Sequence, residues 1–210
     1  VTFQNTCRVK GIHPLPPRVV VAQMDAVLED LHVSGAKTGM LYSADIARAV
    51  ARRLEDETFT VVVDPVLAAG VGDTLSDADL VQAIREHVAP LATVLTPNVP
   101  EAEALVGHDI GDEAAARAAC RELLKLGCRA VLLKGGHMNG PSCQDLLLHR
   151  DKFLVLEYPR VGIRGHGGGC ILAALLAANL AKGMGLGEAA VKAKAAVHQA
   201  VLDNYPIGGG

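Results

Sequence analysis

Aromatic residues, net charge and long apolar runs are all scarce in this sequence. Aromatic residues make up 3% of the 210 residues, and the formal net charge at pH 7 is −3. A nucleic-acid-binding protein needs a basic face or stacking aromatic rings, so we expect no nucleic-acid partner. No apolar run approaches the length of a membrane span, and no basic segment followed by an apolar one opens the chain. We therefore expect neither a membrane partner nor a secretory signal.

Cysteine and histidine residues occur without the spacings that bind metals or form disulfides. The cysteines are odd in number, no C-x-x-C pair is present, and no two histidines lie four residues apart. A disulfide framework or a zinc site is therefore not expected. We expect reduced thiols in a cytoplasmic protein, most of them in its core. The five cysteines are Cys7, Cys120, Cys128, Cys143 and Cys170.

Half of the chain is hydrophobic, and its length fits one domain over residues 1–210. A β-branched run at 58–63 is too continuous for a strand with one wet face, which is typical of a parallel sheet covered on both sides. Strands that alternate with helices predict an α/β fold, a three-layer sandwich with a mostly parallel central sheet and an antiparallel edge hairpin. The periodicity predicts helices at 19–31, 44–54 (capped by Ser43), 77–88, 101–106, 113–126, 170–181 and 188–202, and strands at 37–41, 58–63, 93–95, 130–133, 145–148 and 153–156.

Polar or glycine-rich segments follow three of the predicted strands, and a fourth such segment follows the hairpin. Asp64 follows the first of these strands, the segment 96–101 the second and Lys134 the third, whereas 165–170 follows the hairpin. In an open α/β sheet, ligands bind outside the carboxyl ends of the strands. We therefore expect the four segments to meet at one edge of the sheet.

The glycine-rich turn is the most informative of these segments. Gly167, Gly168 and Gly169 precede a predicted helix that starts at Cys170, and free N–H groups at a helix start bind anions. A thiol there is favoured as a thiolate. The alternative is a tight packing turn with Cys170 as a small buried residue. No G-x-x-x-x-G-K-[ST] motif and no early G-x-G-x-x-G motif occur, which argues against a P-loop and a nicotinamide site.

Two carboxylates and one lysine lie at the predicted strand ends. Asp64 and Glu101 have the oxygen ligands that Mg²⁺ prefers beside phosphates, although Asp64 could only form a turn and Glu101 could only favour the first turn of its helix. Lys134 enters a Gly-Gly pair after an apolar run, and a phosphate contact explains it better than a structural turn. His137 and His166 lie in the same loops, where either could be only a polar loop residue.

Taken together, these segments resemble the hydroxymethylpyrimidine/phosphomethylpyrimidine kinase family of the ribokinase-like superfamily. The matching pieces occur in the family's order and at its spacing. The combination of T-P-N-x-x-E-A with K-G-G-H is specific, although neither piece would decide alone. The pieces are residues 4–6, 39–41, 63–66, 96–102, 133–137 and 166–170.

The resemblance implies a ribokinase-like fold and the ATP- and Mg²⁺-dependent phosphorylation of 4-amino-5-hydroxymethyl-2-methylpyrimidine and of its monophosphate, in thiamine biosynthesis. It also implies that the protein forms a homodimer and that its small-molecule partner is this pyrimidine. Each candidate site residue also takes a role from the resemblance. These roles are catalysis for Cys170 with Gly167, Gly168 and Gly169, substrate binding for Gln4, Met40 and Val66, ATP binding for Lys134, Asn98 and His166, and metal binding for Asp64 and Glu101.

The sequence departs from the family pattern in three places. A strand, a glycine-rich segment and a helix that normally precede the residues matching 1–6 are absent, so we expect a single kinase domain truncated at its N-terminus, with an exposed sheet edge. Gly168 replaces the usual threonine of H-G-T-G-C. The segment 69–72 lacks the lysine that is frequent there.

Two other functions stay open at this point. A pyridoxal kinase of the same superfamily acts on a similar heteroaromatic hydroxymethyl compound, although Cys170 favours the pyrimidine enzymes over it. A regulatory domain that binds ligand without turnover would fit the departures. Retention of Asp64, Glu101, Lys134 and Cys170 argues against that second alternative.

Overall fold

The central sheet is built from short apolar strands that are covered on both faces. The structure, a computed structural model, describes residues 1–67, 79–135, 142–161 and 167–203. Six strands pair in the order β3-β4-β5-β6-β7-β8; the first four are parallel, and β7 and β8 form an antiparallel hairpin at the edge. The strands are β3 (Gly35–Thr38), β4 (Thr60–Val63), β5 (Val94–Leu95), β6 (Ala130–Leu133), β7 (Ser142–His149) and β8 (Lys152–Pro159).

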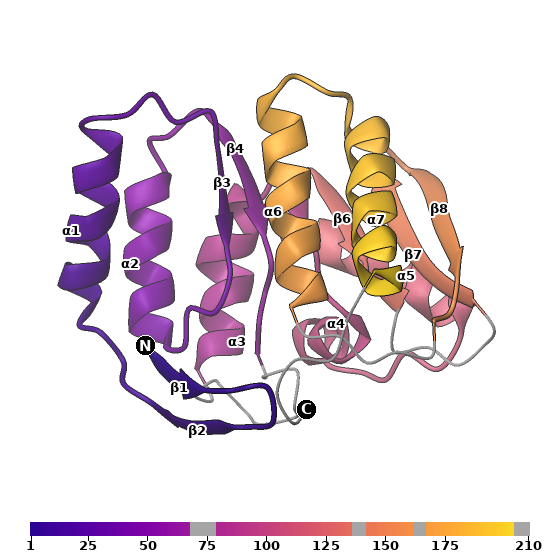
Figure 1. Cartoon of the computed structure of the whole chain (residues 1–210), viewed down its shortest axis with the longest axis horizontal. Coiled ribbons are helices and arrows are strands. Elements are labelled where there is room, and N and C mark those ends of the chain that lie inside the picture. The colour runs from indigo at the N-terminus through magenta and orange to yellow at the C-terminus, as the bar shows by residue number, and fades with distance from the viewer. Residues whose placement is uncertain (68–78, 136–141, 162–166, 204–210) are drawn as a thin grey trace.

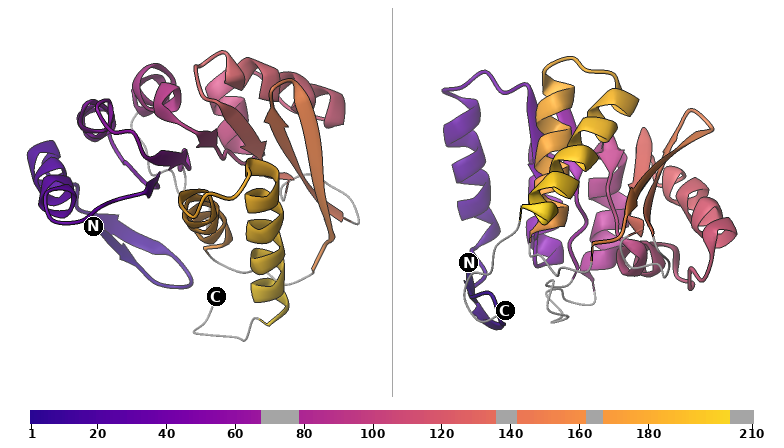
Figure 2. Two further views of the ribbon diagram at one scale, coloured as in Figure 1. Left: turned by 90° about the horizontal axis from the view of Figure 1, so that it is seen from above. Right: turned by 45° about the vertical axis from the view of Figure 1, so that its right-hand side comes forward.

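Helices cover the two faces of this sheet (Figures 1 and 2), which confirms the predicted three-layer α/β sandwich. One face carries α2 (Ala44–Leu54), α3 (Leu80–Ala83), α4 (Val99–Val106) and α5 (Glu113–Leu124), and the other carries α6 (Gly168–Ala181) and α7 (Leu186–Leu202). Helix α3 continues into a π-helical turn, η1 (Ile84–Val88), and a 3₁₀ turn, η2 (Ala89–Leu91). Helix α1 (Pro17–Leu28) packs beside α2.

Alternate residues of the parallel strands β4, β5 and β6 enter two separate cores. Val62, Val94 and Leu132 pack against α6 and α7, whereas Val63 and Leu95 pack against the helices of the opposite face. Because both faces are buried, these strands carry almost no polar residues before their carboxyl ends. The chemistry is thereby concentrated at those ends.

Local signals in the sequence place several helix starts correctly. Helix α2 covers the predicted residues 44–54, and the Ser43 side chain accepts a hydrogen bond from the Ile46 N–H. Asp112 caps α5 in the same way, by accepting from the Ala115 N–H. Such caps satisfy amide groups that the helix itself leaves unpaired.

Some predicted boundaries and patterns are wrong. Helix α6 begins at Gly168 rather than at Cys170, and the first hairpin strand is longer than 145–148, where every side chain is buried rather than alternately exposed. The described part of the helix predicted at 77–88 begins at Leu80. A separate two-stranded sheet, β1 (Thr2–Gln4) with β2 (Val9–Ile12), was not predicted.

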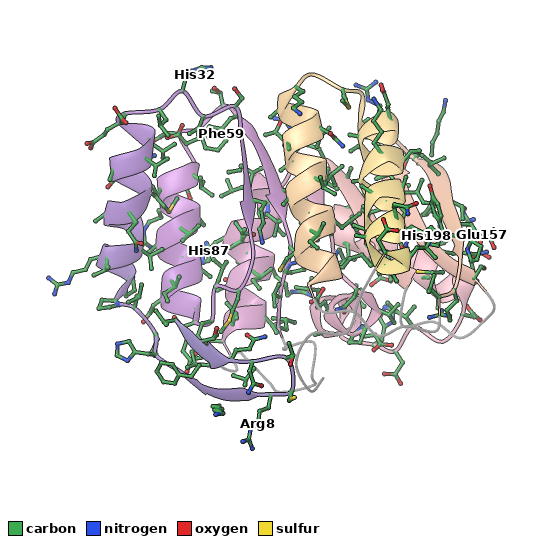
Figure 3. All side chains as sticks on the ribbon, in the orientation of Figure 1. Arg8, His32, Phe59, His87, Glu157 and His198 are labelled. Carbon is green, nitrogen blue, oxygen red and sulfur yellow. The ribbon has the colours of Figure 1, made fainter. Side chains whose placement is uncertain are left out.

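Strand β3 forms one edge of the sheet, since no other described strand pairs with it on the side away from β4. Beside it runs an apolar groove of about 540 Å³. Helix α1 contributes to this groove although none of its residues is buried. Phe59, labelled in Figure 3, borders the groove at the end of the sheet away from hairpin β1–β2.

The helices in the described parts of the chain are also too short or too polar to cross a lipid bilayer.

Candidate active site

Asp64 lies directly after β4, at the carboxyl end of the parallel sheet. Its side chain is almost completely buried, and its Oδ1 accepts hydrogen bonds from the Thr96 hydroxyl at 3.1 Å and from the Lys134 ammonium at 2.6 Å. Thr96 follows β5 and also donates to the Val63 carbonyl. Three neighbouring strand ends therefore meet at one carboxylate.

Glu101 reaches the same place from the first turn of α4. Asn98 caps this helix: its Oδ1 accepts from the Glu101 N–H at 2.8 Å, and Glu101 Oε2 accepts from the Asn98 N–H at 2.8 Å. This reciprocal pair fixes the Glu101 side chain, and Oε2 lies 3.7 Å from the Lys134 Nζ. Burial raises the pKa of the Glu101 carboxyl above its usual value, although the charge of Lys134 opposes this shift.

Lys134 joins the two carboxylates. Its backbone N–H donates to the Pro97 carbonyl at 2.8 Å, which continues the parallel pairing of the strands by one residue beyond β6. Its side chain is only 14% exposed. The cluster of Asp64, Glu101 and Lys134 thus brings two buried carboxyl groups and one amino group together at the edge of the sheet.

The start of α6 points at this cluster. Gly167 has φ +84°, a left-handed conformation that favours glycine, and the helix begins at the next residue. A methyl group added at Gly169 would lie 3.3 Å from the Lys134 Nζ and 3.9 Å from the Asp64 Oδ2. The N–H groups of the first turn of α6, which have no partner within the helix, therefore open next to the cluster.

Cys170 lies in this first turn and is exposed. The alternative of a buried packing cysteine is therefore wrong. Of the other predicted site residues, Met40 follows β3 and Val66 follows Asp64, and both are half-buried. Gln4 is exposed on β1, and hairpin β1–β2 lies at the end of the sheet where α6 begins (Figure 1).

Two predicted loop histidines, His137 and His166, lie outside the described residues. Thr96 was not predicted as a site residue. Its position directly after an apolar strand was a usable signal, since the same rule selected Asp64 and Lys134.

The carboxylates fit a magnesium ion that takes most of its ligands from elsewhere. In the described parts of the chain, no group of three or more His, Cys, Asp or Glu side chains gathers around one point. Mg²⁺ is commonly held by one or two carboxylates, with waters and substrate phosphates as the remaining ligands. Asp64 Oδ2 faces the start of α6, where such phosphates would lie. Asp64 and Glu101 are therefore suitable donors for that ion.

Neither of the two main hollows of the described surface contains this cluster. One is the groove beside β3, and the other, of about 340 Å³, lies between hairpin β7–β8 and the start of α7. We base the site on the convergence of charged side chains and unpaired amides, because these groups, unlike an apolar hollow, have the chemistry to act on a ligand.

A family model described as phosphomethylpyrimidine kinase matches residues 1–210. The chain is 42% identical, over 216 residues, to the hydroxymethylpyrimidine/phosphomethylpyrimidine kinase of Haemophilus influenzae, and it covers 80% of that protein. The chain belongs to the phosphomethylpyrimidine kinase family. It is also 43% identical over 212 residues to a thiamine biosynthesis bifunctional protein of Geobacter sulfurreducens, of which it spans only 43%.

Solved structures agree with membership of the phosphomethylpyrimidine kinase family. A phosphomethylpyrimidine kinase of Clostridium difficile superposes with a TM-score of 0.81 at 31% identity, over 94% of this chain and 82% of its own. A pyridoxal kinase of Staphylococcus aureus in complex with AMP-PCP and pyridoxal superposes with a TM-score of 0.88 at 27% identity, over 99% of this chain and 76% of its own. The predicted ribokinase-like fold is thereby confirmed.

Proposed function

We propose that this chain transfers the γ-phosphoryl group of ATP to the hydroxymethyl group of 4-amino-5-hydroxymethyl-2-methylpyrimidine, and then phosphorylates the monophosphate. The observation that carries the proposal is the meeting of Asp64, Glu101 and Lys134 with the glycine-rich start of α6. The names of the relatives support the reaction, and a neighbouring structure with bound AMP-PCP supports the use of ATP.

The positive groups at the edge of the sheet act on the phosphates of ATP. Phosphoryl transfer has a loose and highly charged transition state, so it depends mostly on positioning and on charge stabilisation. The N–H groups of Gly168, Gly169 and Cys170 donate hydrogen bonds to the phosphoryl group as it is transferred. Gly167 forms the turn that leaves these N–H groups exposed. Lys134 neutralises phosphate oxygens. Mg²⁺, when held by Asp64 and Glu101, supplies further positive charge there.

The acceptor alcohol must lose one proton as its oxygen attacks the phosphorus. Cys170 is the base in this proposal, because it lies in the first turn of α6 beside the amides that hold the phosphoryl group. Gln4 hydrogen-bonds the aminopyrimidine, and Met40 and Val66 form apolar walls of its pocket.

Two residues complete the proposed nucleotide site. Asn98 uses its carboxamide oxygen to cap α4, which leaves its NH₂ group to donate to ATP. His166 is the second predicted contact to ATP.

The test is ATP-dependent phosphorylation of hydroxymethylpyrimidine, of its monophosphate and of pyridoxal, each measured with Mg²⁺. We expect Cys170→Ala to lose turnover and to keep its affinity for ADP, because the thiol acts on the acceptor. Cys7→Ala is the matched control, since Cys7 is also exposed but has no proposed role. Full activity of Cys170→Ala would exclude the thiol as the base. Absence of transfer to any acceptor would refute the proposed function.

A pyridoxal kinase is the second candidate, and the superposition on pyridoxal kinase structures over 99% of the chain favours it. A larger kcat/KM for pyridoxal than for hydroxymethylpyrimidine would make it the better assignment. Binding of nucleotide and pyrimidine without turnover would instead indicate a regulatory domain.

The homodimer, the cytoplasmic location and the single truncated domain stay predictions. Light scattering of the purified chain, in which a dimer has twice the monomer mass, tests the homodimer.

A further inference from the structure

A second buried charge pair lies outside the cluster at the edge of the sheet. Asp145 on β7 and Lys194 on α7 approach to 2.7 Å between Oδ2 and Nζ, and their side chains are only 2% and 11% exposed. Figure 1 shows α7 beside hairpin β7–β8. An ion pair buried in this way gains little stability over well-packed apolar residues. Its presence therefore calls for another explanation.

The second oxygen of Asp145 connects the pair to the chain next to Lys134. Asp145 Oδ1 accepts a hydrogen bond from the Gly135 N–H at 2.9 Å, and this contact is buried. Gly135 is also pressed against β7, since an added methyl group would lie 1.8 Å from the Gln144 carbonyl oxygen. No side chain fits at this position without a shift of the backbone.

Lys134 is thereby fixed from both sides along the backbone. Its own N–H donates to the Pro97 carbonyl, and the next N–H, that of Gly135, donates to Asp145. These two contacts determine where the lysine side chain leaves the sheet. Its Nζ then reaches Asp64 at 2.6 Å and Glu101 at 3.7 Å.

The Lys194 ammonium fixes the Asp145 side chain from the side of α7. Burial lowers the pKa of Lys194, but the carboxylate of Asp145 outweighs this effect, and the pKa lies above its usual value. The Lys194 ammonium also lies 3.3 Å from the Cys143 sulfur. Lys194 therefore stays protonated in this buried position.

We propose that Asp145 and Lys194 are positioning residues that act through Lys134. They hold the Gly135 amide, and so fix the backbone from which the Lys134 ammonium is directed at the phosphates of the nucleotide. This inference rests on the proposed function for its effect on rate. The structural part, the anchoring of Gly135, is independent of that function.

The main test removes both charges at once, with Asp145→Ala and Lys194→Met in one variant. Removing both partners leaves no unpaired buried charge, so the protein is expected to fold. The Gly135 amide should exchange with solvent faster than in the parent, as followed by NMR. The kcat/KM for ATP should fall by about 10-fold or more, the scale typical of residues that orient ligands from outside a site. The dissociation constant for ADP should rise by a similar factor.

A matched control and a double-mutant cycle separate positioning from general stability. Glu188 and Lys192 form an exposed ion pair on the same helix at 2.8 Å, and Glu188→Ala with Lys192→Met should change neither rate nor Gly135 exchange. In a Lys134→Ala background, loss of the Asp145–Lys194 pair should have little further effect on kcat/KM. An equal loss in both backgrounds would mean a merely structural role and would overturn the inference.

A second variant covers the case in which the first fails to fold. Asp145→Asn combined with Lys194→Met keeps the shape of the Asp145 side chain and an accepting oxygen and leaves no unpaired buried charge. The loss of rate of this variant should be proportionate to its loss of Gly135 protection from exchange. Faster exchange with full activity, or unchanged exchange after removal of the pair, would refute the positioning role. An inactive parent protein would refute the proposed function instead, while the exchange measurement would still decide whether Asp145 anchors Gly135.

Discussion

A methyl group placed at Gly169 tests the proposed phosphate site most directly. The added carbon of Gly169→Ala would lie 3.3 Å from the Lys134 Nζ, which is closer than an ordinary van der Waals contact. Lys134 has little room to yield, because Asp64 holds its ammonium at 2.6 Å. The methyl group would therefore occupy the space between the cluster and the first-turn amides of α6.

The expected loss is one of rate rather than of stability. We expect kcat/KM for ATP to fall by about 10- to 100-fold, which corresponds to about 1.4–2.7 kcal/mol of transition-state stabilisation. Alanine is favoured over glycine inside a helix by about 0.5–1 kcal/mol, so the free energy of unfolding should change little or rise. A coupled assay of ADP release and urea denaturation measure the two quantities.

Gly168→Ala is the matched comparison, because its methyl group would meet only Val197 Cγ1 at 3.8 Å, an ordinary contact. Both variants keep the backbone N–H groups of the first turn. We expect the loss of rate at Gly168 to be much smaller than at Gly169. Equal losses in the two variants, or no loss at Gly169, would refute the assignment of this space to the transferred phosphoryl group.

Further predictions concern thiols, a helix cap and pH. Iodoacetamide should label the exposed Cys170 in the native protein but label Cys120 only after unfolding, because burial raises the pKa of Cys120 to about 12; peptide mass spectrometry checks this. Asn98→Ala removes the cap of α4, and urea denaturation should show a loss of about 1 kcal/mol in the free energy of unfolding. The raised pKa of Glu101 means that its carboxylate gains a proton at a higher pH than an exposed glutamate does. As the pH is lowered, the Mg²⁺ concentration for half-maximal activity should therefore begin to rise at a higher pH than the ordinary pKa of a glutamate would give. Glu101→Gln should abolish that pH dependence.

The sequence predicts those helices and strands that are determined by signals within a few neighbouring residues. Ser43 followed by an amphipathic segment predicts α2 to the residue, and the β-branched run that ends at Val63 predicts a buried parallel strand. The same applies to Asp64 and Lys134, because each simply follows a recognisable strand.

Features that depend on distant partners could not be predicted in this way. Lys134 and Asp64 are 70 residues apart, and no periodicity indicates that one neutralises the other. Asp145 lies in a buried part of β7, where its carboxyl group has partners that come from distant parts of the fold, Lys194 on α7 and the Gly135 amide. Hairpin β1–β2 gave no signal, since Phe3 and Gln4 are both exposed and no alternation marks a buried face.

The free edge of β3 has a consequence for how this polypeptide behaves in solution. With no described strand on its outer side, its backbone presents donors and acceptors at the regular spacing that another extended segment can adopt, next to an apolar groove. Lys37 is the exposed residue of this strand, and a charged side chain at an edge opposes edge-to-edge association between molecules. The charge of Lys37 therefore disfavours pairing of β3 with the same strand of a second molecule.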